Sequence, residues 1–355
     1  MPLWSWLFPG AAAALLVASL TLPLGSLLVG ACAVALIGAV IASVHHAEVV
    51  AHKVGEPFGT LVLAVAITVI EVALILTVML AGGPEKAGLA RDTIFAAVMI
   101  IVNGVVGVCV LLGALKHSEQ SFRIEGAGPA LAALVTLATL TLVLPTYTTS
   151  SSVGTYSGSQ LVFAAVASFV VWALFVFVQT VRHRDYFLPP RGALGDDVHA
   201  APPSAAMAWA SFGLLMVALV GVVGLAKALS PSIELALAEA RAPKAVIGII
   251  IAMLVLLPET WAAIRQARAN RLQISMNLAL GSALASIGLT IPVVALFAVW
   301  FDLPLVLGLE AKESVLLGLS FIVATITLGT GRTTLMQGAV HLVIFASFVF
   351  LAFVP

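Results

Sequence analysis

Two glutamates stand inside long apolar stretches. Glu71 lies near the middle of FGTLVLAVAITVIEVALILTVML, and Glu259 lies in AVIGIIIAMLVLLPETWAAI. The nearest Lys or Arg side chains to Glu71 are Lys53 and Lys86. A charged side chain at the centre of a bilayer costs about 2.5–3.5 kcal/mol, so a carboxylate there needs a proton, a cation or an internal partner. The two acids are therefore candidates for binding a proton and a cation in turn.

Each acid also has a structural interpretation. Glu71 in apolar surroundings could stay protonated and bond to a neighbouring helix. Glu259 stands six residues before Arg265 and could be an interfacial acid near a helix end. Pro258 favours the functional interpretation, because its ring removes a backbone donor and frees a carbonyl one turn earlier. We expect a kinked, partly unwound helix at this position.

Polar side chains in the same regions could supply further oxygen ligands. Thr68 stands one turn before the first acid, Asn103 is central in the next apolar stretch, and Ser282, Ser286 and Thr290 recur at four-residue spacing. Hard cations prefer carboxylate, carbonyl and hydroxyl oxygens. Ser and Thr are equally ordinary packing residues of membrane helices, so both interpretations stay open.

A polar cluster precedes the Glu71 stretch and consists of His45, His46, Glu48, His52, Lys53 and Glu56. Histidine titrates near physiological pH, so His45, His46 and His52 with Glu56 could sense protons or line a vestibule. The alternative is a solvated loop. His341, alone in the last apolar stretch, is expected to be a hydrogen-bonding packing residue.

The elements that would position these residues are membrane-spanning helices. The chain is 62% hydrophobic and only 9% charged, against about 25% charged in soluble domains. A helix needs about 20 apolar residues to cross a bilayer. Cutting the sequence at charged and Gly/Pro-rich interruptions predicts eleven spans, at about 7 to 22, 25 to 44, 58 to 81, 92 to 115, 128 to 149, 160 to 181, 207 to 229, 244 to 264, 273 to 300, 313 to 330 and 333 to 354.

Lys and Arg predict the orientation of these spans. Alternate loops give one side with Lys53, Lys116, Arg123, Arg182, Arg184, Arg191, Arg265, Arg268, Arg271 and Arg332. The other side has Lys86, Arg91, Lys227, Arg241, Lys244 and Lys312. Since cytoplasmic loops carry the excess of basic residues, the N-terminus is predicted inside the cell and the protein in the plasma (inner) membrane.

A polar segment divides the chain. Residues 182–206 are rich in Pro and charge and form a predicted cytoplasmic linker, because such a composition cannot bury a core. Five spans lie on each side of the linker once the extra N-terminal helix, 1–22, is set aside. An odd number of spans per half inverts the second half, so 25–181 and 207–355 are predicted inverted repeats within one transmembrane domain.

Other functional classes lack support in the sequence. No H-E-x-x-H, G-x-S-x-G, P-loop or Rossmann pattern in strand context is present, so we expect no enzyme and no cofactor. Sixteen basic residues balance sixteen acidic ones, so no nucleic-acid partner is expected. Cys32 and Cys109 stand in apolar runs without metal-binding or disulfide spacing. The oligomeric state stays open.

Two segments resemble a known family. HHAEVVAHKVGEPFGTLVLAVAITVIEVALI and VLLPETWAAIRQARANRLQISMNLALGSALASIGLTIPVVA look like the two repeat motifs of ChaA-type calcium/proton antiporters, in the cation/calcium exchanger superfamily. The resemblance covers essentially the whole chain. It implies alternating access, in which one acid per repeat, here Glu71 and Glu259, binds metal ion and protons in turn.

The sequence departs from the wider family. Ile67–Glu71 and Val255–Glu259 replace the G-N-A-A-E pattern, and Ala285 replaces an expected Gln. The resemblance therefore implies export of Ca²⁺ and/or Na⁺ or K⁺ in exchange for H⁺ and leaves the ion open. The alternatives are a cation channel with an acidic selectivity site and a non-transporting membrane scaffold.

Overall fold

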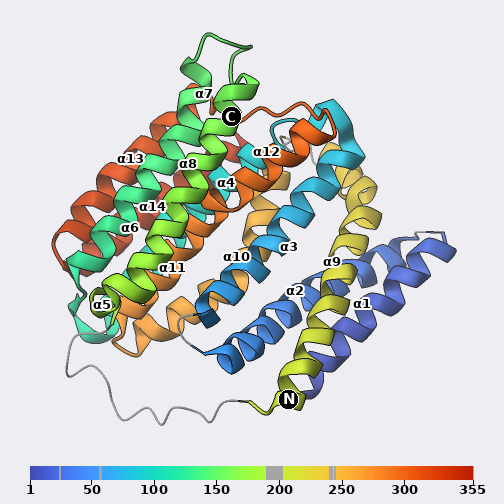
Figure 1. Ribbon diagram of the computed structural model, residues 1–355, viewed down its shortest axis with the longest axis horizontal. Helices are drawn as coiled ribbons and strands as arrows, with labels where there is room; N and C mark the ends of the chain where they lie inside the picture. The colour runs from blue at the N-terminus through green and yellow to red at the C-terminus, as the bar shows by residue number, and fades with distance from the viewer. Residues whose placement is uncertain (24, 56–57, 189–202, 240–242, 244, 355) are drawn as a thin grey trace. The chain divides into compact units, whose positions relative to one another are not determined.

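The computed structural model describes the chain except for residues 24, 56–57, 189–202, 240–242, 244 and 355. Glu56, predicted to line a vestibule, and most of the predicted linker lie outside the described residues. The chain is almost entirely helical (Figure 1). Among the described residues, ten helical segments are long and apolar enough to cross a membrane, and α3 (Phe58–Gly82) contains an eleventh apolar stretch, Val65–Leu80. The predicted polytopic membrane protein with eleven helices is thus confirmed.

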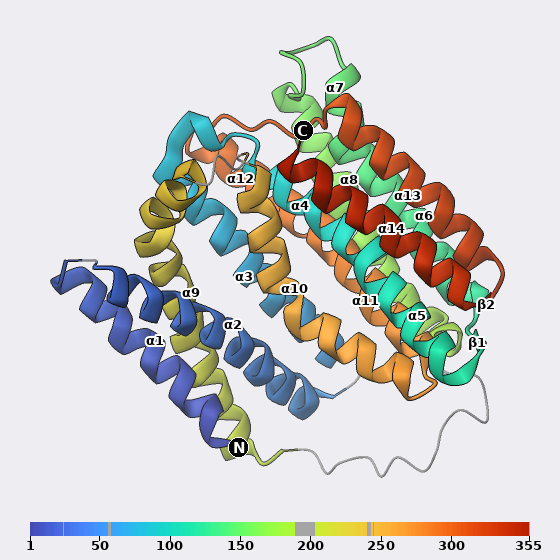
Figure 2. The ribbon, with the colours of Figure 1, turned by 180° about the vertical axis from the view of Figure 1, so that it is seen from behind.

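The helices group into two compact units. Unit 1 comprises residues 1–86 and 199–244. Its described elements are α1 (Leu3–Thr21), α2 (Ser26–Val54), α3, the short 3-10 helix η1 (Gly83–Lys86) and α9 (Ala205–Glu239). Helices α1, α2 and α9 pack on one another and lie side by side in both ribbon views (Figures 1 and 2).

Small residues allow the close packing in unit 1. A Cβ added at Gly221 of α9 would lie 2.9 Å from the Cβ of Ala12 on α1. One added at Gly224 would lie 2.5 Å from Leu16 Cδ1. In a membrane, where lipid is as apolar as Leu, such close approach is a main source of helix association. The extra N-terminal helix is therefore packed tightly against α9.

Unit 2 comprises residues 87–198 and 245–355. Its first-half elements are α4 (Leu89–Met99), η2 (Ile100–Val105), α5 (Val106–His117), β1 (Gln120–Ser121), α6 (Ile124–Ala138), η3 (Thr139–Val143), α7 (Leu144–Tyr147), α8 (Gly158–Phe177), η4 (Val178–Arg182) and η5 (Arg184–Phe187). Its second-half elements are α10 (Ala245–Arg268), α11 (Leu272–Gly288), α12 (Thr290–Trp300), α13 (Ala311–Gly329), β2 (Arg332–Thr333) and α14 (Leu335–Phe353).

The fourth span of the chain is built from three pieces. Helices α4 and α5 are joined by η2, a turn of π-helix, into one continuous segment, Gly83–His117, with η1 at its start. A π turn leaves the regular hydrogen-bond ladder of an α-helix and is often found at functional positions. Here the turn carries Asn103.

Contacts inside unit 2 join the two predicted halves. At one end, β1 pairs antiparallel with β2, Gln120 opposite Thr333. Elsewhere α10 packs on α4 at Gly248, where an added Cβ would lie 2.8 Å from the backbone C of Asp92 and the N of Thr93. Each compact unit thus draws helices from both sides of the linker, so the units cut across the predicted repeats.

Candidate functional site

The first predicted acid lies on α3 in unit 1. Glu71 is 2% exposed and Thr68, one turn earlier, is 6% exposed. Their helix neighbours Ile70, Leu74 and Ile75 are also buried. Since residues three apart share a helix face, Glu71 and Thr68 present a carboxylate and a hydroxyl together within an apolar environment.

The second predicted acid lies on α10 in unit 2. Both carboxylate oxygens of Glu259 are shielded from solvent. The helix continues through Pro258 without interruption, from Ala245 to Arg268. The expected local unwinding at Pro258 is therefore not observed, because the surrounding turns keep helical geometry despite the missing donor. The acid is placed by a regular helix.

Three elements that carry predicted ligands contact one another in unit 2. Helix α10 with Glu259, the π turn η2 with Asn103, and α11 with Ser282 and Ser286 are mutually in contact. Ser286 is 4% exposed. Helix α11 ends at Gly288, so Thr290, the last hydroxyl of the predicted stripe, belongs to α12. The stripe on α11 therefore ends at Ser286.

Asn103 has hydrogen-bond partners that sequence analysis did not assign. Its Nδ2 donates to Ser320 Oγ at 2.8 Å, and its Oδ1 lies 3.2 Å from His341 Nδ1. His341 Nε2 lies 3.1 Å from Thr327 Oγ1. Ser320 and Thr327 are two of the four hydroxyl residues of α13, and the sequence signal that sets them apart is a shared helix face at seven-residue spacing. The prediction that His341 is a hydrogen-bonding packing residue is confirmed.

The predicted histidine cluster is helical. Helix α2 extends to Val54, so the interpretation of residues 45–53 as a solvated loop is wrong; the segment stays helical, and its residues His46 and Ala47 are buried against neighbouring helices. His46 is fully buried, with Nε2 2.8 Å from the Ser5 carbonyl and Nδ1 3.3 Å from Ser211 Oγ. The ring centroids of His45 and Trp4 lie 4.8 Å apart, whereas His52 is exposed.

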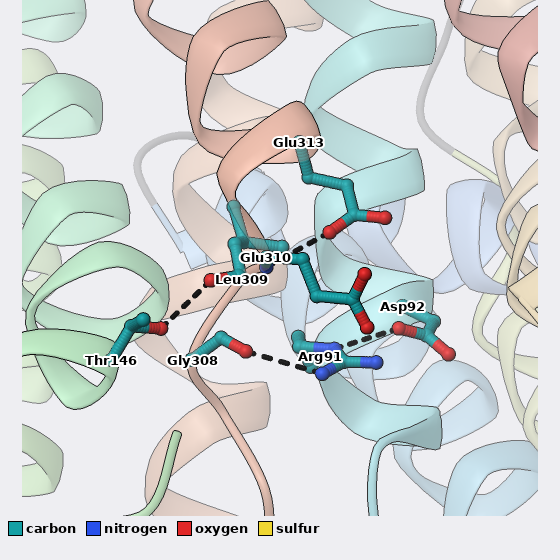
Figure 3. A network of polar contacts seen from close by, with 7 residues as sticks. All are labelled: Arg91, Asp92, Thr146, Gly308, Leu309, Glu310 and Glu313. Atoms are coloured by element: carbon teal, nitrogen blue, oxygen red, sulfur yellow. Dashed lines mark hydrogen bonds and ion pairs between the residues drawn. The ribbon is translucent and has the colours of Figure 1, made fainter. Parts of the chain in front are cut away.

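A second polar network lies at the start of α4 (Figure 3). Arg91 Nε donates to Asp92 Oδ1 at 2.8 Å, and Arg91 Nη1 donates to the Gly308 carbonyl at 3.1 Å. Thr146 Oγ1 donates to the Leu309 carbonyl at 2.7 Å. The carboxylate of Glu310 points toward Arg91 in Figure 3. These bonds fasten the extended segment before α13 to α4 and α7.

The predicted ligands are divided between the two units. Glu71 and Thr68 belong to unit 1, while Glu259, Asn103, Ser282 and Ser286 belong to unit 2. Each unit holds one shielded carboxylate and predicted hydroxyl ligands, and carboxylate and hydroxyl oxygens suit hard cations and protons. The pairing of the two acids is still a prediction from the sequence.

Comparisons with known proteins agree on one family. A sequence model of the family described as sodium/calcium exchanger protein matches residues 23–181 and 210–354. The y4hA protein of Sinorhizobium fredii is 48% identical over 363 residues, spanning 100% of this chain and 97% of that protein. The sodium-potassium/proton antiporter ChaA of Escherichia coli is 35% identical over 313 residues, 87% of this chain and 84% of that one.

A solved structure has the same fold. Native YfkE superimposes with a TM-score of 0.76 over 99% of this chain and 100% of its own, at 18% sequence identity. The family match begins at residue 23, so α1 precedes it.

Proposed function

Because the chain belongs to the sodium/calcium exchanger protein family, we propose that it is a secondary active antiporter that exports Ca²⁺ and/or Na⁺ or K⁺ in exchange for H⁺. The observation that carries the proposal is the placement of Glu71, 2% exposed, and Glu259, with both carboxylate oxygens shielded, within apolar helices. The name of ChaA, a sodium-potassium/proton antiporter, supports the same chemistry.

The proposed mechanism follows from the cost of burying charge. A bare carboxylate is expensive in a low-dielectric site, whereas a protonated or cation-bound carboxylate is nearly neutral. Proton and cation then compete for the same oxygens, and only a loaded site converts cheaply between the two access states. Exchange results because an empty, charged site is the costly state.

The proposed ligands are oxygen atoms. Thr68 would add a hydroxyl oxygen on the helix of Glu71, and Ser282 and Ser286 would add hydroxyl oxygens in the unit of Glu259, since hard cations take hydroxyl oxygens readily. His45, His46 and His52 with Glu56 stay a proposed proton-sensing group on the cytoplasmic side. The excess of Lys and Arg in alternate loops supports an inner-membrane protein with a cytoplasmic N-terminus.

Purified protein in sealed vesicles tests the proposal. An imposed pH gradient should drive Na⁺, K⁺ or Ca²⁺ uphill, and adding each cation in turn should dissipate the gradient reported by a pH-sensitive dye. Glu71→Gln and Glu259→Gln should each abolish this coupled flux. Glu125→Gln, which changes an exposed acid in the first turn of α6, should leave it intact.

The same experiment separates the alternatives. A cation channel would let ions run only down their gradient, with no obligatory proton movement. A scaffold would show no cation-dependent flux at all. Full coupled flux in either glutamine variant would remove that carboxylate from the mechanism.

A further inference from the structure

We propose that His341 is a positioning residue of the exchange site: its neutral imidazole holds Asn103 and, through it, the π turn that packs against the helices of Glu259 and Ser286. This inference rests on the proposed function. It assigns His341 and Asn103 a role in ion affinity without direct contact to the ion.

The hydrogen bonds determine the state of the imidazole. Ser320 Oγ lies 2.7 Å from the Leu316 carbonyl, to which its hydroxyl donates. The same oxygen must therefore accept from Asn103, which places the amide nitrogen toward Ser320 and the amide oxygen toward His341. An amide oxygen only accepts, so Nδ1 of His341 carries the proton and Nε2 accepts from the Thr327 hydroxyl. With a neutral imidazole, the polar side-chain atoms of Asn103, Ser320, His341 and Thr327 all have hydrogen-bond partners within this network.

The network is sealed from solvent. Asn103, Ser320 and His341 are each 0% exposed and Thr327 is 1% exposed. In such a low-dielectric interior, a fully satisfied polar network favours one geometry, because breaking any bond leaves a buried polar atom without a partner. The network therefore fixes the orientation of the Asn103 side chain.

Glycines on α5 and α14 let these helices approach closely enough for His341 to contact Asn103. A Cβ added at Gly338 of α14 would lie 2.6 Å from the backbone N of Leu111 on α5. One added at Gly107 would lie 3.1 Å from the Cβ of His341. Helices α5 and α14 therefore approach closely at Gly107 and Gly338. This approach brings the imidazole of His341 within hydrogen-bonding distance of Asn103.

The π turn links this network to the candidate site. Element η2 contacts α13 and α14 on the side of His341, and it also contacts α10 and α11, which carry Glu259 and Ser286. A π turn departs from the regular hydrogen bonding of the α-helices on either side of it. In this inference the side-chain bonds of Asn103 restrain the turn, so their loss displaces the surface on which α10 and α11 rest.

Two conservative variants of His341 distinguish a hydrogen bond that positions Asn103 from a side chain that only fills the space between the helices. The amide of Asn occupies the place of the imidazole Nδ1, and the amide of Gln occupies the place of Nε2. His341→Asn therefore keeps the donor to Asn103, while His341→Gln keeps only the contact to Thr327. In the vesicle assay, we expect His341→Gln to raise KM for the exported cation about 3- to 20-fold, the worth of one interhelical hydrogen bond, with the maximal rate unchanged. His341→Asn should stay close to wild type.

A double-mutant cycle and matched controls complete the test. If Asn103 and His341 act as a unit, Asn103→Ala combined with His341→Gln should raise KM no more than the larger single change. Ser347→Ala on α14 and Thr325→Ala on α13 remove hydroxyls that bond only to their own helix. Both should leave KM unchanged.

Each outcome decides one point. Equal KM values in the Asn and Gln variants, or a lowered melting temperature with unchanged KM, would overturn the positioning role. Additive KM effects in the cycle would overturn the coupling through Asn103. A wild-type protein that shows no coupled exchange would instead refute the proposed function and, with it, this inference.

Discussion

The imidazole Nε2 of His46 lies 2.8 Å from the backbone carbonyl of Ser5, and this contact joins α1 to α2. A carbonyl oxygen only accepts, so Nε2 donates and Nδ1 is left to accept from Ser211 Oγ on α9, 3.3 Å away. One buried side chain therefore connects three helices of unit 1. The N-terminal helix, which precedes the family match, is fastened by residues of the chain's own core.

Replacing this imidazole should loosen unit 1. His46→Ala leaves the buried Ser5 carbonyl and the Ser211 hydroxyl without their partner, at a cost of about 1–3 kcal/mol in unfolding free energy. His52→Ala, two turns along the same helix, changes an exposed side chain and should have almost no effect. Thermal unfolding of the detergent-purified variants measures the difference. Equal melting temperatures for the two variants would show that the His46 contacts contribute nothing.

The crossing of α4 and α10 should tolerate no side chain at Gly248. An added Cβ would meet backbone atoms of Asp92 and Thr93 at 2.8 Å, and backbone cannot rotate away as a side chain can. Gly248→Ala should therefore destabilise the protein by about 1–3 kcal/mol, as overpacking does. It should also weaken exchange, because α10 carries Glu259.

Gly318→Ala is the matched control for this prediction. The position faces open space within α13, and Ala in a helix is more favourable than Gly by about 0.4–1 kcal/mol. This variant should be at least as stable as wild type. A Gly248→Ala protein with wild-type stability and exchange would show that the two helices are not in tight contact.

The predicted orientation can be tested by labelling. Cys32 and Cys109 are both 0% exposed, so a membrane-impermeant maleimide should report cysteines introduced at exposed positions. In whole cells Ser152→Cys should react from outside, and Glu119→Cys should react only after permeabilisation, because its loop carries the basic residues Lys116 and Arg123. The opposite pattern would place the N-terminus outside.

Much of the fold could be predicted because apolar length dominates in a membrane. Eleven stretches separated by charge or by Pro and Gly are each found as helical segments. Helix α1 ends at Thr21 and α2 begins at Ser26, each within one residue of the predicted boundaries, 22 and 25. Helix α2 continues ten residues beyond its predicted end at 44, because charge and His content predict a loop there, whereas His46 and Ala47 are buried and keep the segment packed as a helix.

The site was only partly predictable, for a related reason. An isolated acid such as Glu71 is conspicuous in an apolar span, so its burial could be expected from cost alone. The hydrogen bonds of Asn103 to Ser320 and His341 could not be predicted, since these partners lie 217 and 238 residues away in the sequence. Local spacing holds no signal for contacts that arise when distant helices cross at glycines.

In the proposed mechanism, proton and cation compete for the carboxylates of Glu71 and Glu259. Adding Na⁺, K⁺ or Ca²⁺ to the purified protein in weakly buffered detergent should release protons in proportion to the cation bound, read with a pH-sensitive dye alongside a binding isotherm. We expect this release in wild type and in Glu125→Gln, and none in the double variant Glu71→Gln, Glu259→Gln. Cation binding without proton release in wild type, or release that persists in the double variant, would contradict this mechanism.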